Sequence, residues 1–179
     1  MTRLSDLLLR ATARRVGPWG DLTGDRAGVM LHYTAGTDLS GLQWLLFDPA
    51  CRVSYNWLVL DDGTVVSVAP KGSRAWHAGA CRRSNRVVAY GDANSAFYGI
   101  AIAAAPGDHA TERQLAMVVQ LVAALFAEHG WSSEWVESRL TDHAAEAWPR
   151  GRKVDTGDVL PLDLVQSMVA ARLRAQAAA

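Results

Sequence analysis

The chain alternates short apolar runs with longer stretches in which apolar side chains recur every three or four residues. The clearest short runs are 28–33, 53–60, 64–68 and 98–103, bounded by glycine, proline or polar residues. Runs of this length favour β-strands, whereas a spacing of three and four favours amphipathic helices. We therefore predict a strand at each of these ranges and a further short strand at 135–140.

Apolar residues at helical spacing predict four helices: 4–15, Ser40 to Phe47, Thr111 to Gly130 and 162–178. Ser40 is the expected N-cap of the second helix. Thr111 and Gln114 form the pattern of a capping box at the start of the third helix. Strands interleaved with helices predict an α/β domain with a central sheet.

The segment from Lys71 to Asn94 follows neither pattern. It is rich in glycine, serine, arginine and alanine, and it contains Trp76 and His77. A linker would not need aromatic side chains, so we interpret this segment as a functional loop that returns to a strand.

The length and charge of the chain fit one ordinary globular domain. The chain has 179 residues, and its 18 basic and 18 acidic side chains cancel. A single core of this size is sufficient for folding. Because there is no basic excess, we expect no nucleic-acid partner. The sequence does not indicate an oligomeric state, and we treat the protein as a monomer by default.

The apolar content gives no sign of a leader or a membrane span. The run Leu7–Leu9 has only three residues and lies between charged side chains. A secretory signal needs roughly 7–15 apolar residues, and a spanning helix needs about 20. We therefore expect the chain to be made in the cytoplasm.

The two cysteines, Cys51 and Cys81, do not form a metal-binding pair, and whether they form a disulfide stays open.

Three side chains are candidate metal ligands. His32 ends the first core strand, His143 follows the predicted strand 135–140, and Asp155 lies in the turn-rich loop beyond it. Zinc hydrolases use three such ligands and leave one position for water. The alternative is that each histidine is an ordinary hydrogen-bonded residue at a strand end, and spacing alone does not decide between the two.

Four motifs occur in a specific order: Leu31–Gly36, Val53–Val59 followed by Asp62-Gly63, Ala75–Gly79, and Gly151–Gly157. Together they resemble the type-2 N-acetylmuramoyl-L-alanine amidases, a superfamily that includes peptidoglycan recognition proteins. The resemblance covers roughly residues 27–160. It implies an α/β fold with a central mixed sheet, flanking helices and a single zinc in a surface groove. Residues 1–179 then form one amidase domain, with a helical extension at 1–20, the family core at 27–160 and a C-terminal helix at 162–178.

The resemblance also implies roles for individual residues. One zinc ion would be bound by His32, His143 and Asp155. Lys153 would stabilise the oxyanion formed when water attacks the lactyl carbonyl. Tyr55 would orient that water or pass a proton to the leaving nitrogen. The alternatives are a solvated Lys153 and a Tyr55 that only packs on the sheet, on the same face as Trp57.

The Trp-His-Ala-Gly loop lines the substrate groove in this family. We therefore assign substrate binding to Trp76, His77 and Asn56. Trp76 could instead anchor the loop. The arginines within 82–86 either contact carboxylates of the peptidoglycan stem peptide or are simply solvated.

The implied function is hydrolysis of the bond between the lactyl group of N-acetylmuramic acid and L-alanine in peptidoglycan. Ala101 stands where the cytoplasmic recycling branch has a glutamate, which favours the branch that uses tyrosine and lysine. We therefore expect a bacteriolytic endolysin that reaches the cell wall after lysis or release. The alternatives are a muropeptide-recycling amidase, a non-catalytic peptidoglycan-binding module and an additional role in binding a host protein.

Overall fold

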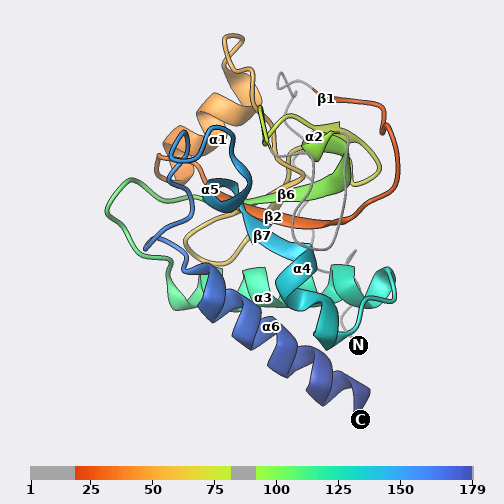
Figure 1. The fold of residues 1–179 in the computed structure, drawn as a ribbon. Coiled ribbons are helices and arrows are strands. Elements are labelled where there is room, and N and C mark those ends of the chain that lie inside the picture. The colour runs from red at the N-terminus through yellow and green to blue at the C-terminus, as the bar shows by residue number, and fades with distance from the viewer. Residues whose placement is uncertain (1–18, 82–91, 179) are drawn as a thin grey trace.

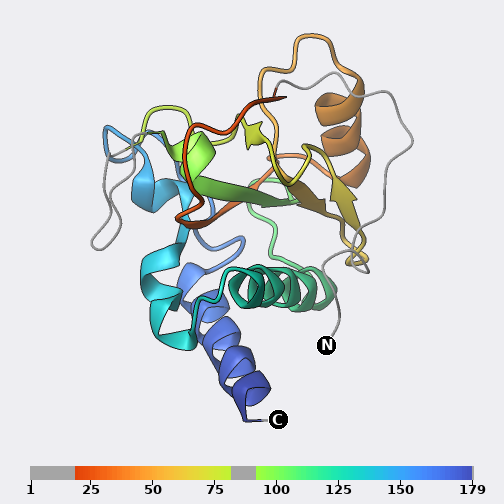
Figure 2. The same ribbon diagram turned by 90° about the vertical axis from the view of Figure 1, so that its right-hand side faces the viewer.

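The computed structural model describes residues 19–81 and 92–178, so the helix predicted at 4–15 and the arginines within 82–86 lie outside the described residues. A five-stranded sheet occupies the centre, with helices on both faces (Figures 1 and 2). Its strand order is β4 (Val65–Ser67), β3 (Trp57–Val59), β6 (Phe97–Ile102), β2 (Gly28–Tyr33) and β7 (Leu140–Asp142). Only β4 runs antiparallel to its neighbour, so the predicted mixed sheet is confirmed.

Two helices cover one face of the sheet, α3 (Glu112–Glu128) and α6 (Leu162–Ala177). The predicted capping box is present at the start of α3: Thr111 Oγ1 accepts the Gln114 N–H at 3.1 Å, and Gln114 Oε1 accepts the Thr111 N–H at 2.9 Å. The largest apolar cluster lies between these helices and the sheet, and it includes Val29, Leu31 and Ile100.

Helix α1 (Asp38–Phe47) packs over the opposite face, against a smaller cluster that includes Leu45, Leu58 and Ala101. Its N-cap is Thr37 rather than the predicted Ser40. Thr37 has an extended backbone and its hydroxyl accepts the Ser40 N–H, which places Ser40 within the first helical turn.

The predicted strand at 135–140 is wrong over most of its length. Residues Ser133–Trp135 form the short 3-10 helix η2 and Val136–Arg139 form helix α4, so β7 begins only at Leu140. Val136 and Leu140 are both buried. Their spacing of four residues fits one helical turn, which leads into a three-residue strand.

The predicted strand at 53–60 shortens to β3, because residues 53–56 bond irregularly to two different segments: Ser54 N donates to Trp76 O, and Asn56 N donates to Gly99 O. The strict alternation of side chains therefore fails before Trp57. Trp57 packs in the cluster under α3, whereas Tyr55 packs on the α1 side. The prediction that these two rings share a face is wrong.

The loop from Lys71 contains a short strand, β5 (Arg74–Ala75), which pairs with β1 (Trp19–Gly20). It ends at helix α2 (Ala93–Ala96).

The two cysteines, Cys51 and Cys81, are free thiols. No single helix among residues 19–81 and 92–178 is long and apolar enough to cross a membrane, and only the pair Glu112–Glu128 and Ser133–Arg139, bent by 115°, has the required length and composition together.

Candidate metal centre

His32 is positioned by the alternation of side chains along β2. Leu31 belongs to the cluster under α3, so the next residue, His32, points to the opposite face of the sheet. The side chain is fully buried there. Its register partner on β6 is Ala101, which has a small side chain, and on the other side the pairing of β2 with β7 ends one residue earlier, at Leu31.

His143 is the first residue of helix α5 (His143–Glu146), immediately after β7. β7 runs parallel to β2 with Leu31 opposite Asp142, which carries the chain past His32. Asp142 then caps α5, since its carboxylate accepts the Ala145 N–H at 2.8 Å. The ring centroids of His32 and His143 lie 4.8 Å apart.

Asp155 comes from the loop between α5 and α6, and hydrogen bonds on both sides hold this loop. The Asp155 carbonyl accepts the Ala144 N–H at 2.6 Å. Thr156 is fully buried, and its hydroxyl donates to Leu160 O at 2.6 Å. These bonds fix the backbone on either side of the carboxylate.

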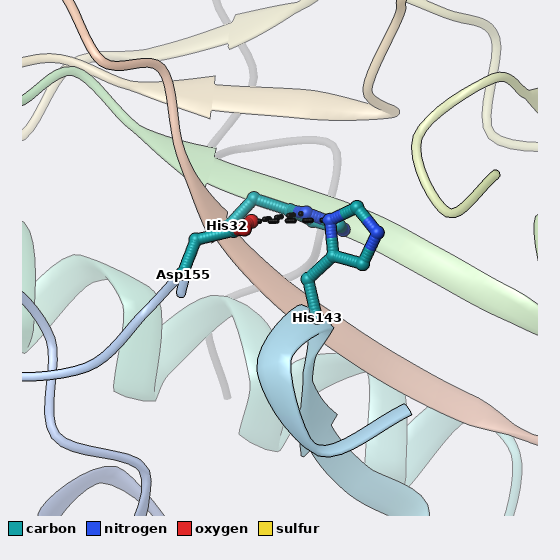
Figure 3. A group of neighbouring side chains, drawn as sticks. All are labelled: His32, His143 and Asp155. Atoms are coloured by element: carbon teal, nitrogen blue, oxygen red, sulfur yellow. Dashed lines mark hydrogen bonds and ion pairs between the residues drawn. The ribbon is translucent and has the colours of Figure 1, made fainter. Parts of the chain in front are cut away.

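The three predicted ligands converge on one point, as Figure 3 shows. Asp155 Oδ2 lies 3.1 Å from His32 Nδ1 and 3.2 Å from His143 Nδ1. The ligand atoms of the three residues all lie within 4.8 Å of one another. They come from β2, from the start of α5 and from the loop before α6, so the fold brings together residues that are distant in the sequence.

The second nitrogen of each imidazole is hydrogen-bonded to the protein. His143 Nε2 lies 2.7 Å from the carbonyl oxygen of Ala78, which can only accept a hydrogen. His32 Nε2 lies 3.0 Å from His77 Nδ1. Arg152 Nη2 also lies 3.5 Å from His143 Nε2, but it donates to the carbonyls of Ala78 and Ala80 at shorter distances. The Nδ1 atoms are therefore left to face Asp155.

The charge states fit a bound cation. Burial is the main cause that lowers the pKa of His32 to about 4, so this imidazole is neutral near pH 7. Burial raises the pKa of Asp155, but the two neighbouring imidazoles of His143 and His32 outweigh that effect and hold it well below its usual range. When both Nε2 atoms carry the hydrogens, two nitrogen lone pairs and one carboxylate face each other with no hydrogen between them. Zinc takes this combination of neutral histidine and ionised carboxylate.

Tyr55 lies against the centre on the side of α1. Its ring centroid is 5.1 Å from that of His32. Burial is the main cause that raises the pKa of its hydroxyl above the ordinary value, and the charge of Asp155 adds to it. Tyr55 therefore keeps its proton near neutral pH and can act as a hydrogen-bond donor there.

Lys153 lies two residues before Asp155 and is exposed. Burial is the main cause of the lowered pKa of His32, and the positive charge of Lys153 is a smaller contribution in the same direction. The charge of Lys153 therefore disfavours the protonated form of His32, while the side chain itself is accessible from solvent.

The three residues predicted to bind substrate are placed differently from one another. Trp76 is 42 % exposed, and the guanidinium of Arg74 stacks over its ring at 4.7 Å. Asn56 is fully buried, and its amide bonds with backbone groups of Gly99 and Ser73. His77 is also buried and points its ring at His32. The structure thus places His77 in the interior, next to the His32 nitrogen that faces away from Asp155, and leaves Trp76 at the surface.

A pocket of about 310 Å³ beside Tyr55 was not anticipated from the sequence. It lies between α1 and the loop after β2, and its lining includes Trp44 and Val53. Ala35, also in the lining, adopts a φ of 58°, which is uncommon for a residue with a side chain. The available signal in the sequence was Trp44, an aromatic residue that is exposed on a helix whose buried residues include Leu45 and Leu46.

Solved structures with this fold cover nearly the whole chain. A selenomethionine derivative of AmpD is 21 % identical, with a TM-score of 0.67, over 89 % of this chain and 95 % of that chain. The endolysin amidase LysCS from Clostridium intestinale URNW is 13 % identical, with a TM-score of 0.63, over 89 % and 93 %. A mutant endolysin from Bacillus subtilis is 19 % identical, with a TM-score of 0.60, over 90 % and 97 %. At these identities the likeness establishes the fold.

No curated protein matches the chain. The sequence profile of the N-acetylmuramoyl-L-alanine amidases, in contrast, matches residues 23–158. This range covers most of the chain and includes β2, α5 and all three residues of the candidate metal centre. The chain therefore belongs to the N-acetylmuramoyl-L-alanine amidase family.

Proposed function

We propose that this protein is a zinc-dependent amidase that hydrolyses the bond between the lactyl group of N-acetylmuramic acid and L-alanine in peptidoglycan. The observation that carries the proposal is the convergence of His32 Nδ1, His143 Nδ1 and Asp155 Oδ2 within the range matched by the family profile. These three residues would hold one zinc ion and leave a fourth position open.

The side chains around the centre have distinct tasks in this reaction. When bound, zinc would activate a water molecule for attack and polarise the scissile carbonyl. The exposed ammonium of Lys153 stabilises the negative charge that develops on the carbonyl oxygen. Tyr55, which keeps its proton near pH 7, donates a hydrogen bond to the water or a proton to the leaving nitrogen.

Substrate contact is best assigned to surfaces that are open. Trp76 is exposed and its ring is flanked by Arg74, so it can stack on a substrate group. The pocket beside Tyr55, with Trp44 in its lining, is the adjoining volume for a glycan or stem-peptide group. Asn56 and His77 are buried, so we no longer assign them to substrate contact.

We propose a lytic endolysin role, in which the protein acts on the cell wall after lysis or release. The structural likeness to proteins named endolysins from Clostridium intestinale and Bacillus subtilis supports this role. Beside His32 in the sheet, β6 provides Ala101 rather than an acidic side chain, so Tyr55 and Lys153 are the candidate proton donor and charge stabiliser. The likeness to AmpD keeps soluble muropeptides as the competing substrate class.

The test is release of new L-alanine amino groups from purified sacculi and, in parallel, from soluble muropeptides. Wild type is compared with His143→Ala, and zinc content is measured for both. We expect activity and one bound zinc per chain in wild type, both lost in the variant. Zinc binding without hydrolysis of either substrate would favour a binding module. Cleavage of soluble muropeptides alone would overturn the endolysin role.

A further inference from the structure

We propose that His77 is a positioning residue for the metal centre. Its Nδ1 accepts the Nε2–H of His32 and thereby holds the His32 ring so that the Nδ1 lone pair points toward Asp155. This inference rests on the proposed zinc site, and it gives the buried His77 a role that differs from substrate binding.

The direction of the hydrogen bonds follows from one backbone carbonyl. His77 Nε2 lies 3.2 Å from Phe97 O, which can only accept, so this nitrogen carries the hydrogen. A neutral His77 then has an acceptor at Nδ1, which lies 3.0 Å from His32 Nε2. His32 must place its hydrogen on Nε2, and its Nδ1 is left with a lone pair. The carbonyl of Phe97 therefore determines which nitrogen of His77 carries its hydrogen, and His77 in turn determines which nitrogen of His32 does.

A strand glycine makes room for the His77 ring. A Cβ atom at Gly99 would lie 2.7 Å from both Cγ and Cδ2 of His77, so any side chain at this position of β6 would displace the ring. The rings of His77 and His32 meet edge to face, with centroids 5.0 Å apart and an interplanar angle of 78°. The position of His77 is thus set by close packing as well as by hydrogen bonds.

The backbone that carries His77 is held by a buried side chain. Asn94 Oδ1 accepts the N–H groups of His77 and Ala78 at 2.9 and 2.8 Å. Ala78 in turn provides the carbonyl that accepts from His143 Nε2. Two adjacent residues, fixed by one carboxamide, therefore orient both imidazoles of the centre.

The acceptor carbonyl of Phe97 is itself anchored. Arg26 Nη1 donates to it at 2.9 Å, and Arg26 Nη2 donates to Ser73 O at 2.6 Å. The guanidinium also stacks on the ring of Tyr98 at 4.2 Å. The support for His32 thus extends from the metal centre through His77 into the body of the domain.

The experiment measures zinc affinity by competition with a chromophoric chelator. His77→Leu removes the acceptor, whereas His77→Gln keeps an acceptor for His32 and a donor for Phe97. Loss of such an outer partner typically weakens metal binding by about 10–100-fold. We expect that loss for His77→Leu and an affinity within a few-fold of wild type for His77→Gln.

The control is Gln114→Leu, which removes the buried hydrogen bond from Gln114, on helix α3 at the far face of the sheet, to the carbonyl oxygen of Ala103. It should lower the stability and leave zinc affinity unchanged. If His77→Leu does not fold, Gly99→Ala, which keeps His77 but displaces its ring, should show the same loss of affinity. Wild-type zinc affinity in His77→Leu, or equal losses in the leucine and glutamine variants, would overturn this inference alone. A wild type that binds no zinc would overturn the proposed function as well.

Discussion

Burial favours the uncharged form of each side chain in the candidate metal centre. It therefore lowers the pKa of His32 and acts to raise the pKa of Tyr55 and of Asp155. The pKa of the carboxylate is nevertheless held well below its usual range by the neighbouring His143 and His32. With hydrogens on both Nε2 atoms, the centre presents one carboxylate, two nitrogen lone pairs and one proton donor, which is the set that a zinc hydrolase needs.

Tyr55→Phe tests the proton donor. The change removes the hydroxyl and keeps the ring that lies against His32. Because a positioned proton donor typically contributes 10²–10⁴-fold, we expect kcat on sacculi to fall by roughly that factor, with zinc content unchanged. Steady-state hydrolysis and metal analysis check both statements. A variant with wild-type kcat would show that Tyr55 only packs beside the centre.

The lowered pKa of His32 predicts how the metal-free protein responds to acid. At pH values between about 4 and 6.5 the unfolded chain binds a proton at His32 that the folded chain does not, so stability falls as the pH is lowered through this window. Burial lowers the pKa of His77 as well, which acts in the same direction. Urea unfolding in EDTA at pH 7, 6 and 5 measures the slope.

Replacing His32 with glutamine should reduce this pH dependence of the unfolding free energy. A wild-type stability that does not change between pH 7 and 5 would contradict the prediction.

Single residues of the site differ in how far the sequence could reveal them. His32, His143 and Asp155 are polar residues at strand ends or in adjoining loops, and the structure brings these three together. The position of His77 behind His32 depends on the strand register and on the close approach of Gly99, which no local pattern encodes. Asn56 could not be placed either, because the predicted strand around it is irregular.

At the scale of elements, a close contact joins the start of β2 to the end of α4, just before β7, and these are the segments that lead to the two histidines of the candidate metal centre. Gly28, at the start of β2, lies against the backbone of Arg139, so closely that a Cβ atom would overlap its carbonyl. Arg139 Nη1 also donates to Ala27 O at 2.8 Å. This contact holds together the two strands that lead to His32 and His143.

Gly28→Ala should therefore affect both stability and the metal centre. Overpacking of a tight contact costs about 1–3 kcal/mol, and separation of β2 from β7 should also weaken zinc binding. Denaturant unfolding and chelator competition measure the two effects. Gly72→Ala is the matched control, because no atom lies within 4 Å of the added Cβ; its stability should stay within about 0.5 kcal/mol of wild type. Equal stability of the two variants would show that the close contact between Gly28 and Arg139 does not hold β2 and β7 together.

The elements that the sequence predicted well are those with strong local signals. The capping box at Thr111 and the long helical repeat after it gave α3, and the repeat from Leu162 gave α6. The segment 135–140 was predicted wrongly, because a short apolar run fits one helical turn as well as a strand. Its conformation is decided by the parallel pairing of β7 with β2, a tertiary contact.

At the scale of the whole molecule, the centre joins parts of the chain that are far apart. Asp155 and His32 are separated by 123 positions, and they lie in the loop before α6 and in strand β2, respectively. The α3 and α6 layer forms the large apolar core, whereas the centre lies on the face that α1 covers. A cation bound there would link β2, α5 and the loop before α6. These links would add to the apolar contacts that hold the sheet and the helices together.

Zinc should therefore stabilise the whole fold and not only the site. A ligand that binds only the folded state at 100 times its Kd adds about 2.7 kcal/mol, which for a domain of this size raises Tm by roughly 5–10 °C. Thermal unfolding of wild type with saturating zinc and with EDTA measures this difference. His143→Ala, which removes one ligand, should unfold at the same temperature in both conditions. If zinc instead raised the Tm of wild type and of His143→Ala equally, the ion would be binding elsewhere, because a centre that lacks one of its three ligands cannot give the same linkage.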